Sequence, residues 1–215
     1  MYAVVLNGEA LIFDPHKSQE LTNILFEKRV KKIIIILTHE HHDHTSGIYW
    51  YKERFDSTII CQKLGADYMS SRKYLRAMLL TFILSEEDKI NGTQRLEEFN
   101  KEFVPQQYRA DVTYGNEFSF TWNNHKLELT HIPGHSKGSS LIIIDDRFVF
   151  TGDSLLKDIP IITRFPGSSQ IDYKQITLPI LRKKLKNNMT IFPGHGNPFI
   201  FYELIKGGEL YVQFR

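Results

Sequence analysis

The sequence has little of what marks secreted or membrane-embedded proteins. Its single cysteine, Cys61, cannot form an internal disulfide, which suits a reducing compartment. The first residues are apolar, but Asn7, Gly8 and Glu9 follow at once, and this is not the pattern of a signal peptide. The densest apolar stretch, residues 74–84, contains Arg76 and is too short to cross a bilayer. We therefore expect a cytoplasmic protein with no membrane partner.

The chain also lacks an excess of charge of either sign. Lys and Arg number 27, Asp and Glu number 25, and the formal net charge is +2. This balance offers no basic footprint for nucleic acid or for an anionic membrane surface. A content of 41% hydrophobic and 24% charged residues is that of an ordinary globular chain. At 215 residues, we expect one domain spanning residues 1–215.

Strand and helix patterns alternate along the chain and predict a mixed α/β fold. Residues 2–6 and 10–13 are predicted strands around an Asn7-Gly8 turn, and the β-branched run at 33–37 is typical of a buried strand. Strand patterns return from residue 112. Between residue 62 and about residue 110, helical spacing predicts an insertion in which Ser85 and Asp88 resemble a capping box. Asp172 is predicted to cap a later helix.

Histidine is the residue in excess. The chain has nine, and four of them lie between His39 and His44, directly after the predicted strand at residues 33–37. Imidazole and carboxylate groups at this spacing suit Zn²⁺, and also Mn²⁺ or Fe²⁺. A solvated polar loop is the alternative, but this density of histidine, with Asp43 among them, favours a metal site.

Further ligands have to come from elsewhere, and three strand ends offer them. His135, Asp153 and His195 each follow a glycine at the end of a predicted strand. A glycine lets the backbone and a ligand approach closely, and strand ends are where functional sites are usually placed. Taken with the histidine cluster, these positions predict one composite metal site.

The residues from Thr38 to His44 match the T-H-x-H-x-D-H signature of the metallo-β-lactamase-fold hydrolases, which the chain resembles over essentially its whole length. The resemblance implies an αββα sandwich: two facing mixed β-sheets, helices on the outer faces and a metal site at one edge. Asp14 would support the histidine loop. The implied ligands are His39, His41 and His135 for the first metal, and Asp43, His44 and His195 for the second, with Asp153 bridging both.

The chemistry implied by this resemblance is metal-assisted hydrolysis. Two Zn²⁺ ions per chain, with Fe or Mn as alternatives, would share a bridging hydroxide that attacks an acyl carbon. Asp43 would be the catalytic residue that takes or delivers a proton. The implied partner is a small-molecule acyl substrate.

An aspartate at position 153 resembles the glyoxalase II-like branch, which includes thioesterases and lactonases, more than the true β-lactamases. Only a short segment of this sequence follows His195, so we do not expect the helical glutathione-binding domain of glyoxalase II. The expected activity is therefore cleavage of a thioester, ester or lactone. A mononuclear iron enzyme of the persulfide dioxygenase type is the alternative. A β-lactamase or a non-catalytic binding module is less favoured.

The helical insertion has two interpretations. It could supply an apolar substrate pocket with a cationic contact, or it could pack on itself or form a homodimer surface. The apolar candidates are Tyr68, Tyr74, Met78, Phe82 and Phe99, and the cationic candidates are Lys63, Arg72, Lys73 and Arg76. We expect His42 to face solvent or support the loop, and His16, His125 and His131 to have no role as ligands.

Overall fold

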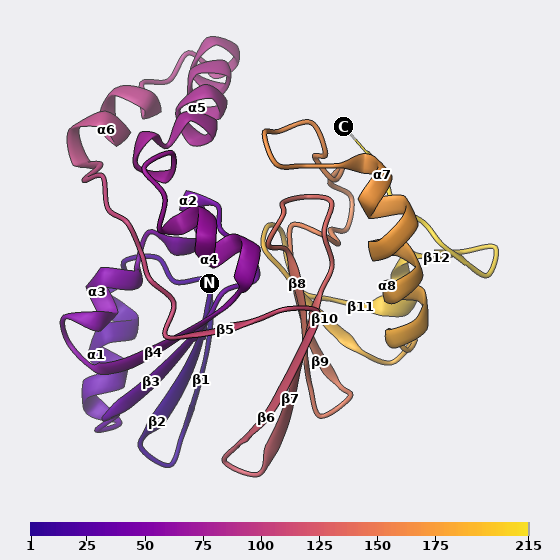
Figure 1. Ribbon diagram of the computed structural model, residues 1–215, viewed down its shortest axis with the longest axis horizontal. Coiled ribbons are helices and arrows are strands. Elements are labelled where there is room, and N and C mark those ends of the chain that lie inside the picture. Colours follow the sequence, from indigo (N-terminus) through magenta and orange to yellow (C-terminus); the bar gives the residue numbers. More distant parts are fainter. Residues whose placement is uncertain (215) are drawn as a thin grey trace.

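Two β-sheets packed face to face form the centre of the molecule in the computed structural model, which describes residues 1–214 apart from the side chains of Arg76, Met78 and Leu79 (Figure 1). The first sheet has the order β1-β2-β3-β4-β5 and the second the order β11-β10-β9-β8-β7-β6. In Figure 1 they lie side by side, with helices outside both. The predicted αββα sandwich is confirmed.

The first sheet is formed by β1 (Tyr2–Leu6), β2 (Glu9–Phe13), β3 (Lys32–Ile36), β4 (Asp56–Gln62) and β5 (Val112–Tyr114). The β1–β2 hairpin is antiparallel and turns at Asn7 and Gly8, both at positive φ as a tight hairpin turn requires. The strands from β2 to β5 are parallel. The carboxyl ends of these parallel strands therefore meet at one edge.

The second sheet is formed by β6 (Glu117–Trp122), β7 (His125–His131), β8 (Ser140–Ile144), β9 (Phe148–Gly152), β10 (Thr190–Pro193) and β11 (Phe199–Ile200). Its strands are antiparallel except for the parallel pair β9–β10. Strands β7, β9 and β10 run in the same direction. The segments that carry His135, Asp153 and His195 therefore leave the sheet at one edge.

Alternation of side chains along the strands builds the layers. In β2, Leu11 and Phe13 enter the core between the sheets, whereas Ala10 and Ile12 enter the core beneath the outer helices. The two sheets meet at Phe13 and Phe150, whose stacked ring centroids are 3.7 Å apart. On the far side of the second sheet, Leu181 belongs to a third apolar cluster.

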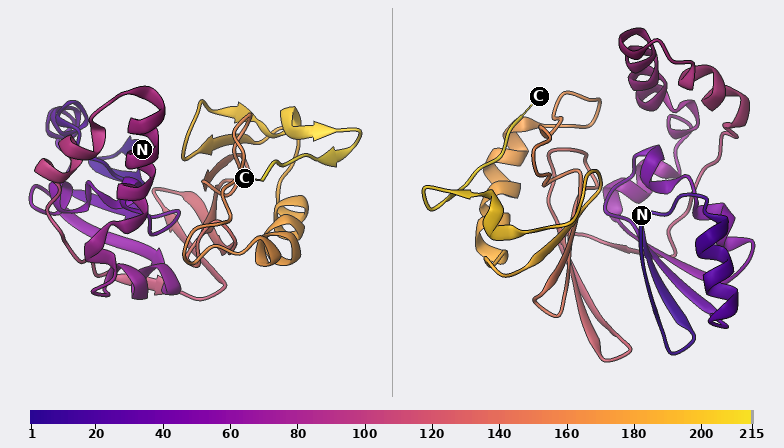
Figure 2. Two further views of the ribbon diagram at one scale, coloured as in Figure 1. Left: turned by 90° about the horizontal axis from the view of Figure 1, so that it is seen from above. Right: turned by 180° about the vertical axis from the view of Figure 1, so that it is seen from behind.

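Helices cover both outer faces (Figure 2). The first sheet is covered by α1 (Gln19–Glu27), α3 (Ile48–Lys52) and α4 (Lys63–Met69). The second is covered by a continuous helical segment of α7 (Gln170–Asp172), a π-helical turn η2 (Tyr173–Thr177) and α8 (Leu178–Lys184). A short turn η3 (Phe201–Leu204) and the hairpin β12 (Ile205–Lys206) and β13 (Glu209–Leu210) complete the chain's described part.

The insertion is helical, as predicted, and consists of α4, the turn η1 (Tyr74–Arg76), α5 (Met78–Asn91) and α6 (Arg95–Glu102). Helices α5 and α6 project from the body at the upper left of Figure 1, above the histidine-bearing helix α2 (His42–Thr45). The expected capping box at Ser85 and Asp88 is wrong. Both residues lie inside α5, and Asp88 instead accepts backbone N–H groups from Arg95 and Leu96 at the start of α6.

The prediction for the later helix is also wrong in its cap. Ser169, not Asp172, is the capping residue, because its hydroxyl accepts a hydrogen bond from the Asp172 backbone N–H at 3.1 Å. Pro179 lies in the first turn of α8, just after the π-helical turn. Among the described helices, none is long and apolar enough to cross a membrane.

Candidate metal centre

The histidine loop leaves the first sheet at the end of β3 and is held there by a buried aspartate at the end of β2. The Asp14 carboxylate accepts hydrogen bonds from the Thr38 backbone N–H (2.7 Å), the Thr38 hydroxyl (2.6 Å) and His44 Nδ1 (2.9 Å). Asp14 is only 6% exposed and adopts a positive φ of 51°, a conformation that Asp tolerates better than most residues. Asp14 therefore supports the loop, as the resemblance implied.

Three histidines converge to form what we call the first half-site: His39, His41 and His135. His41 Nδ1 lies 3.0 Å from His39 Nε2 and 3.1 Å from His135 Nε2. A tetrahedral Zn²⁺ with Zn–N bonds of about 2.0–2.1 Å spaces its ligand nitrogens about 3.3–3.4 Å apart. The two measured separations are slightly shorter than this spacing, so the three nitrogens are close enough together to hold one ion.

Four residues form the second half-site: Asp43, His44, Asp153 and His195. His195 Nε2 lies 3.3 Å from Asp43 Oδ2 and 3.4 Å from Asp153 Oδ2. His44 Nε2 lies 3.5 Å from Asp43 Oδ2 and 3.4 Å from Asp153 Oδ1. Two imidazoles and two carboxylates thus face one point.

Asp153 links the two half-sites. Its Oδ2 lies 3.6 Å from His135 Nε2 of the first half-site and 3.4 Å from His195 Nε2 of the second. Its Oδ1 is buried and has no hydrogen-bond partner within the described part of the chain. A buried carboxylate oxygen without a partner is costly, and a bound cation would satisfy it. The donor set therefore fits a pair of divalent ions sharing this carboxylate.

The outer hydrogen bonds determine which ring nitrogen of each histidine faces the centre. Carbonyl and carboxylate oxygens only accept, so His135 Nδ1 donates to the Ile162 carbonyl (3.0 Å) and His44 Nδ1 donates to Asp14. The Thr38 hydroxyl donates to Asp14 and accepts from His39 Nδ1 at 3.1 Å. In all three residues Nε2 is left to face the centre, which is how metal-binding histidines are usually oriented.

Burial and neighbouring imidazoles keep the three histidines of the first half-site uncharged. Burial, together with the neighbouring His135, lowers the pKa of His41 to about 3. Burial and the charge of His44 hold the pKa of His39 well below its usual value, and burial also lowers that of His135. Neutral imidazoles are the form that binds a metal ion.

In the second half-site the pKa shifts are opposite: those of the histidines are raised and those of the carboxylates are lowered. Hydrogen bonds to Asp153 and Asp43 raise the pKa of His195 to about 10. Burial opposes the charged form of His44, but Asp43, Asp153 and Asp14 outweigh it and raise its pKa well above normal. Burial likewise opposes ionisation of Asp43 and Asp153, yet the charge of His44 and the hydrogen bond from His195 hold both pKa values well below normal. In the metal-free protein, the raised pKa values of His44 and His195 therefore favour their positively charged forms.

Two glycines let the ligand-bearing loops approach this closely. A Cβ atom at Gly194 would lie 2.2 Å from Asp153 Oδ1 and 2.7 Å from His44 Cε1. A Cβ atom at Gly152 would lie 2.3 Å from the Thr38 hydroxyl, and Gly152 also adopts a φ of 50°. These glycines are required both for space and, at residue 152, for backbone conformation.

The structure brings together all seven residues expected as ligands, and it adds one buried residue, Glu40, that sequence reasoning missed. Glu40 is 5% exposed, although it lies between His39 and His41 in the signature. Tyr74 is fully buried, and its ring stacks on His42 with centroids 4.0 Å apart while its hydroxyl contacts that of Thr45. Nothing in the motif distinguishes Glu40 from a solvent-facing spacer.

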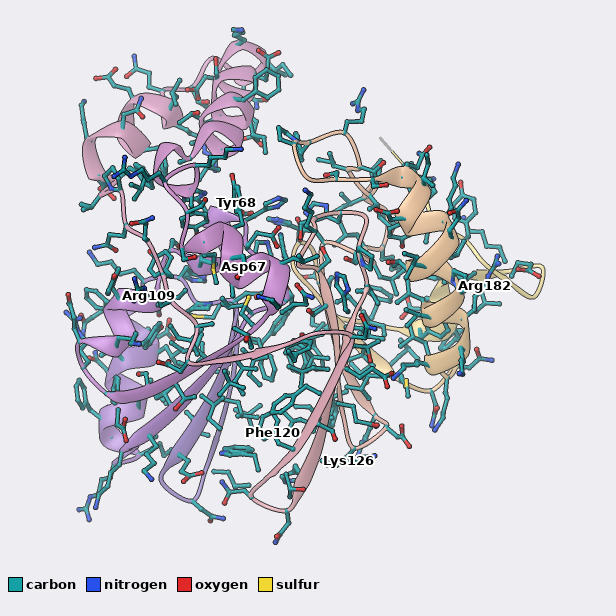
Figure 3. All side chains as sticks on the ribbon, viewed as in Figure 1. Asp67, Tyr68, Arg109, Phe120, Lys126 and Arg182 are labelled. Atoms are coloured by element: carbon teal, nitrogen blue, oxygen red, sulfur yellow. The ribbon has the colours of Figure 1, made fainter. Side chains whose placement is uncertain are left out.

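His42 therefore packs against the insertion, which agrees with the expected role in supporting the loop. Tyr74, one of the candidates for an apolar pocket, has no exposed surface, which favours the interpretation in which these residues pack within the protein. Tyr68 and Phe82 are exposed, by 42% and 60%, and Lys63 forms an exposed ion pair with Asp67 (3.3 Å; Tyr68 and Asp67 are labelled in Figure 3). The side chains of Met78 and Arg76, which were also expected at the pocket, lie outside the described residues.

Three other histidines lie outside both half-sites. His125 forms an exposed pair with Asp145, and His131 Nε2 donates to the Lys137 carbonyl oxygen. His16 contributes its backbone carbonyl to the Tyr51 hydroxyl. None of the three belongs to a ligand group among the described residues.

An αββα sandwich with histidine and aspartate side chains that could hold metal ions at one edge is an arrangement typical of metallo-hydrolases. The family model of the metallo-beta-lactamase superfamily matches residues 1–195, and the chain belongs to this superfamily. It is 24% identical over 203 residues to the probable metallo-hydrolase YqgX of Bacillus subtilis, covering 91% of this chain and 83% of that protein.

Two further relatives extend the comparison. A hydroxyacylglutathione hydrolase of Pelagibacter ubique is 22% identical over 147 residues, which is 68% of this chain but only 46% of that enzyme. The crystal structure of TTHA1623 in a di-iron-bound form superposes with a TM-score of 0.66 at 20% identity, covering 93% of this chain and 88% of that one. At this identity the superposition demonstrates a shared fold.

Proposed function

We propose that the protein is a metal-dependent hydrolase that uses two metal ions, zinc by preference, to cleave a thioester, ester or lactone bond in a small-molecule acyl substrate. The observation that supports this most strongly is the position of Asp153, whose two oxygens face both half-sites while the buried Oδ1 has no hydrogen-bond partner among the described residues. Superfamily membership and the similarity to a hydroxyacylglutathione hydrolase agree with it.

In this proposal His39, His41 and His135 would hold one ion, Asp43, His44 and His195 would hold the other, and Asp153 would contribute to both. Divalent ions at such a site lower the pKa of water and polarise a carbonyl oxygen, which is the chemistry that acyl hydrolysis needs near neutral pH. The protein's own contribution is to orient the ligands. Asp14 and the Ile162 carbonyl do so by fixing the imidazole rings.

Asp43 is proposed to handle the proton. Its side chain is 39% exposed, which makes it more accessible than the 13% exposed Asp153, and its carboxylate lies between His44 and His195. A carboxylate at the open side of the site can accept a proton from an entering water and return it to a leaving group.

The site indicates the kind of bond that is cleaved, and not a particular substrate. The match to the Pelagibacter hydroxyacylglutathione hydrolase covers less than half of that enzyme, so we do not extend the proposal to glutathione. A second candidate, a mononuclear iron dioxygenase, is favoured by one observation: His135 and Asp153 lie 3.6 Å apart beside further histidines, the imidazole-and-carboxylate set that also suits non-heme iron.

The test is a hydrolysis screen with zinc-loaded protein on acyl-thioesters, lactones and β-lactams, combined with metal analysis. We expect turnover of a thioester or lactone and about two zinc ions per chain, both lost in His41→Ala and Asp43→Ala. His125→Ala is the matched control, because this histidine lies in an exposed ion pair outside both half-sites and its removal should change neither quantity. One iron per chain with oxygen uptake would support the dioxygenase instead.

A further inference from the structure

Glu40 is a buried carboxylate that the proposed hydrolysis does not use. It lies in the sequence between two residues of the first half-site, yet its side chain is buried and its hydrogen-bond partners lie in another loop. Glu40 Oε2 accepts a hydrogen bond from the Ser136 hydroxyl at 2.8 Å and one from the Gly138 backbone N–H at 3.2 Å. Ser136 directly follows His135, so this carboxylate joins the histidine loop to the loop that carries the third ligand of the first half-site.

The surroundings of Glu40 are neutral. Among the side chains that the structure describes, no lysine, arginine or histidine forms an ion pair with it, and its partners are a hydroxyl and backbone N–H groups. In an ion pair, the negative charge of Glu40 would be its main contribution. A hydroxyl and a backbone N–H instead need an acceptor oxygen at a fixed position. In all of these hydrogen bonds Glu40 is the acceptor, so its contribution depends on the positions of its two carboxylate oxygens.

A third segment closes on the same point. A Cβ atom at Gly138 would lie 2.5 Å from Gly65 Cα and 2.7 Å from Glu40 Oε2, and a Cβ atom at Gly65 would lie 3.2 Å from the same oxygen. Gly65 belongs to α4, at the start of the insertion. The backbones of these two glycines thus pack against the Glu40 carboxylate and restrict its orientation.

We propose that Glu40 is a positioning residue that sets the separation between His41 and His135, and hence the fit of the first half-site for a metal ion; this inference rests on the proposed function only in taking that half-site to bind metal. His41 Nδ1 and His135 Nε2 lie 3.1 Å apart. They come from loops separated by 94 positions in the sequence, and Glu40 provides a direct side-chain connection between those loops beside the ligands.

A purely structural role would give a different result from a positioning role. If Glu40 only stabilised the fold, its loss would lower stability and weaken metal binding at both half-sites alike. If it positions two ligands of one half-site, its loss should weaken that half-site selectively. Removal of groups that orient metal ligands typically costs 10–100-fold in metal affinity.

The experiment measures Co²⁺ affinity of the metal-free protein by absorption titration for Glu40→Gln in two backgrounds. Glutamine keeps the volume but replaces one acceptor oxygen with an N–H₂ group that faces donors. In a His195→Gln background, which leaves the first half-site intact, we expect affinity to fall about 10–100-fold. In a His41→Gln background, which leaves the second half-site intact, we expect a change of less than about threefold.

Asp111→Asn is the matched control. The Asp111 carboxylate also accepts a backbone N–H, from Ile59 at 2.8 Å, but it joins β4 to a segment that carries no ligand. This substitution should leave Co²⁺ affinity unchanged in both backgrounds. Equal losses at the two half-sites in Glu40→Gln, or no loss at the first, would overturn the inference.

Ser136→Ala provides a second route if Glu40→Gln does not fold. It removes the hydroxyl donor and keeps the carboxylate, and we expect about a tenfold loss at the first half-site. Adding Ser136→Ala to a folded Glu40→Gln variant should cost little more, because the two residues act through one contact. Protein that binds two Co²⁺ ions but hydrolyses no acyl substrate would refute the proposed function and leave this inference standing, whereas protein that binds no Co²⁺ would refute both.

Discussion

The two half-sites should differ in the number of protons that a metal ion displaces. The perturbation is the addition of successive zinc ions to metal-free protein near pH 7.5. His41 has a pKa of about 3, and those of His39 and His135 are also lowered, so the first half-site holds no proton to release. His195 has a pKa of about 10, so it is protonated in nearly every molecule at this pH.

The magnitude follows from competition between protons and metal. Binding at the second half-site has to remove the His195 proton, so its apparent affinity should rise about tenfold per pH unit up to about pH 10. His44, whose pKa is also raised, adds up to one further proton. The affinity of the first half-site should stay flat between about pH 6 and 9, and this half-site should therefore fill first near neutral pH.

Isothermal titration calorimetry in buffers of different ionisation enthalpy counts these protons. We expect none released with the first zinc ion and one to two with the second. A proton lost from a bound water molecule would add to the second step, so His195→Gln serves as the control: the difference between it and the unaltered protein counts the His195 proton alone. Equal release in the two steps would refute the electrostatic difference between the half-sites.

Three further predictions concern the same centre. Asp14→Asn removes an acceptor for three donors, so we expect it to lower stability by about 1–3 kcal/mol in urea unfolding and to weaken zinc binding 10–100-fold at the second half-site, where it orients His44. Gly194→Ala places a methyl group 2.2 Å from Asp153 Oδ1, and metal analysis should show loss of the second ion with the first retained. The metal-free protein should be most stable near pH 6.5, as measured by urea unfolding across pH. Below that pH the histidines of the first half-site bind protons in the unfolded chain but not in the folded one, so stability falls as the pH is lowered. Above it the histidines of the second half-site keep protons in the folded chain that the unfolded chain releases, so stability falls as the pH is raised. The free energy of unfolding should change by about 1.4 kcal/mol per pH unit for each net proton. A flat profile between pH 5 and 9 would contradict the last prediction.

Much of this fold could be predicted from local patterns because those patterns agree with the tertiary structure. The Asn7-Gly8 turn forms the β1–β2 hairpin, and the run of isoleucines becomes β3, covered on both faces. The seven candidate ligands could be named because the motifs of the family resemblance name them, and the structure brings these side chains together at one edge of the two sheets.

Predictions from the sequence failed where the same residue pattern occurs in more than one kind of local structure. A Ser-x-x-Asp pattern occurs in helix interiors as well as at N-termini, and in this chain Ser85 and Asp88 lie within α5. The sequence also left open whether Tyr74 lines a pocket or packs within the protein, and in the structure its buried ring stacks on His42. Such burial depends on how the insertion packs on the sandwich, and a local pattern contains no information about that contact.

The distribution of the ligands over the two sheets has a consequence for mechanical behaviour. The histidine loop belongs to the first sheet, whereas His135, Asp153 and His195 follow strands of the second. An ion held by both groups is a cross-link between segments far apart in the sequence, closing a large loop as a disulfide does. A chain with one cysteine has no covalent link of this kind, so its metal ions would be the points at which the two halves resist being pulled apart.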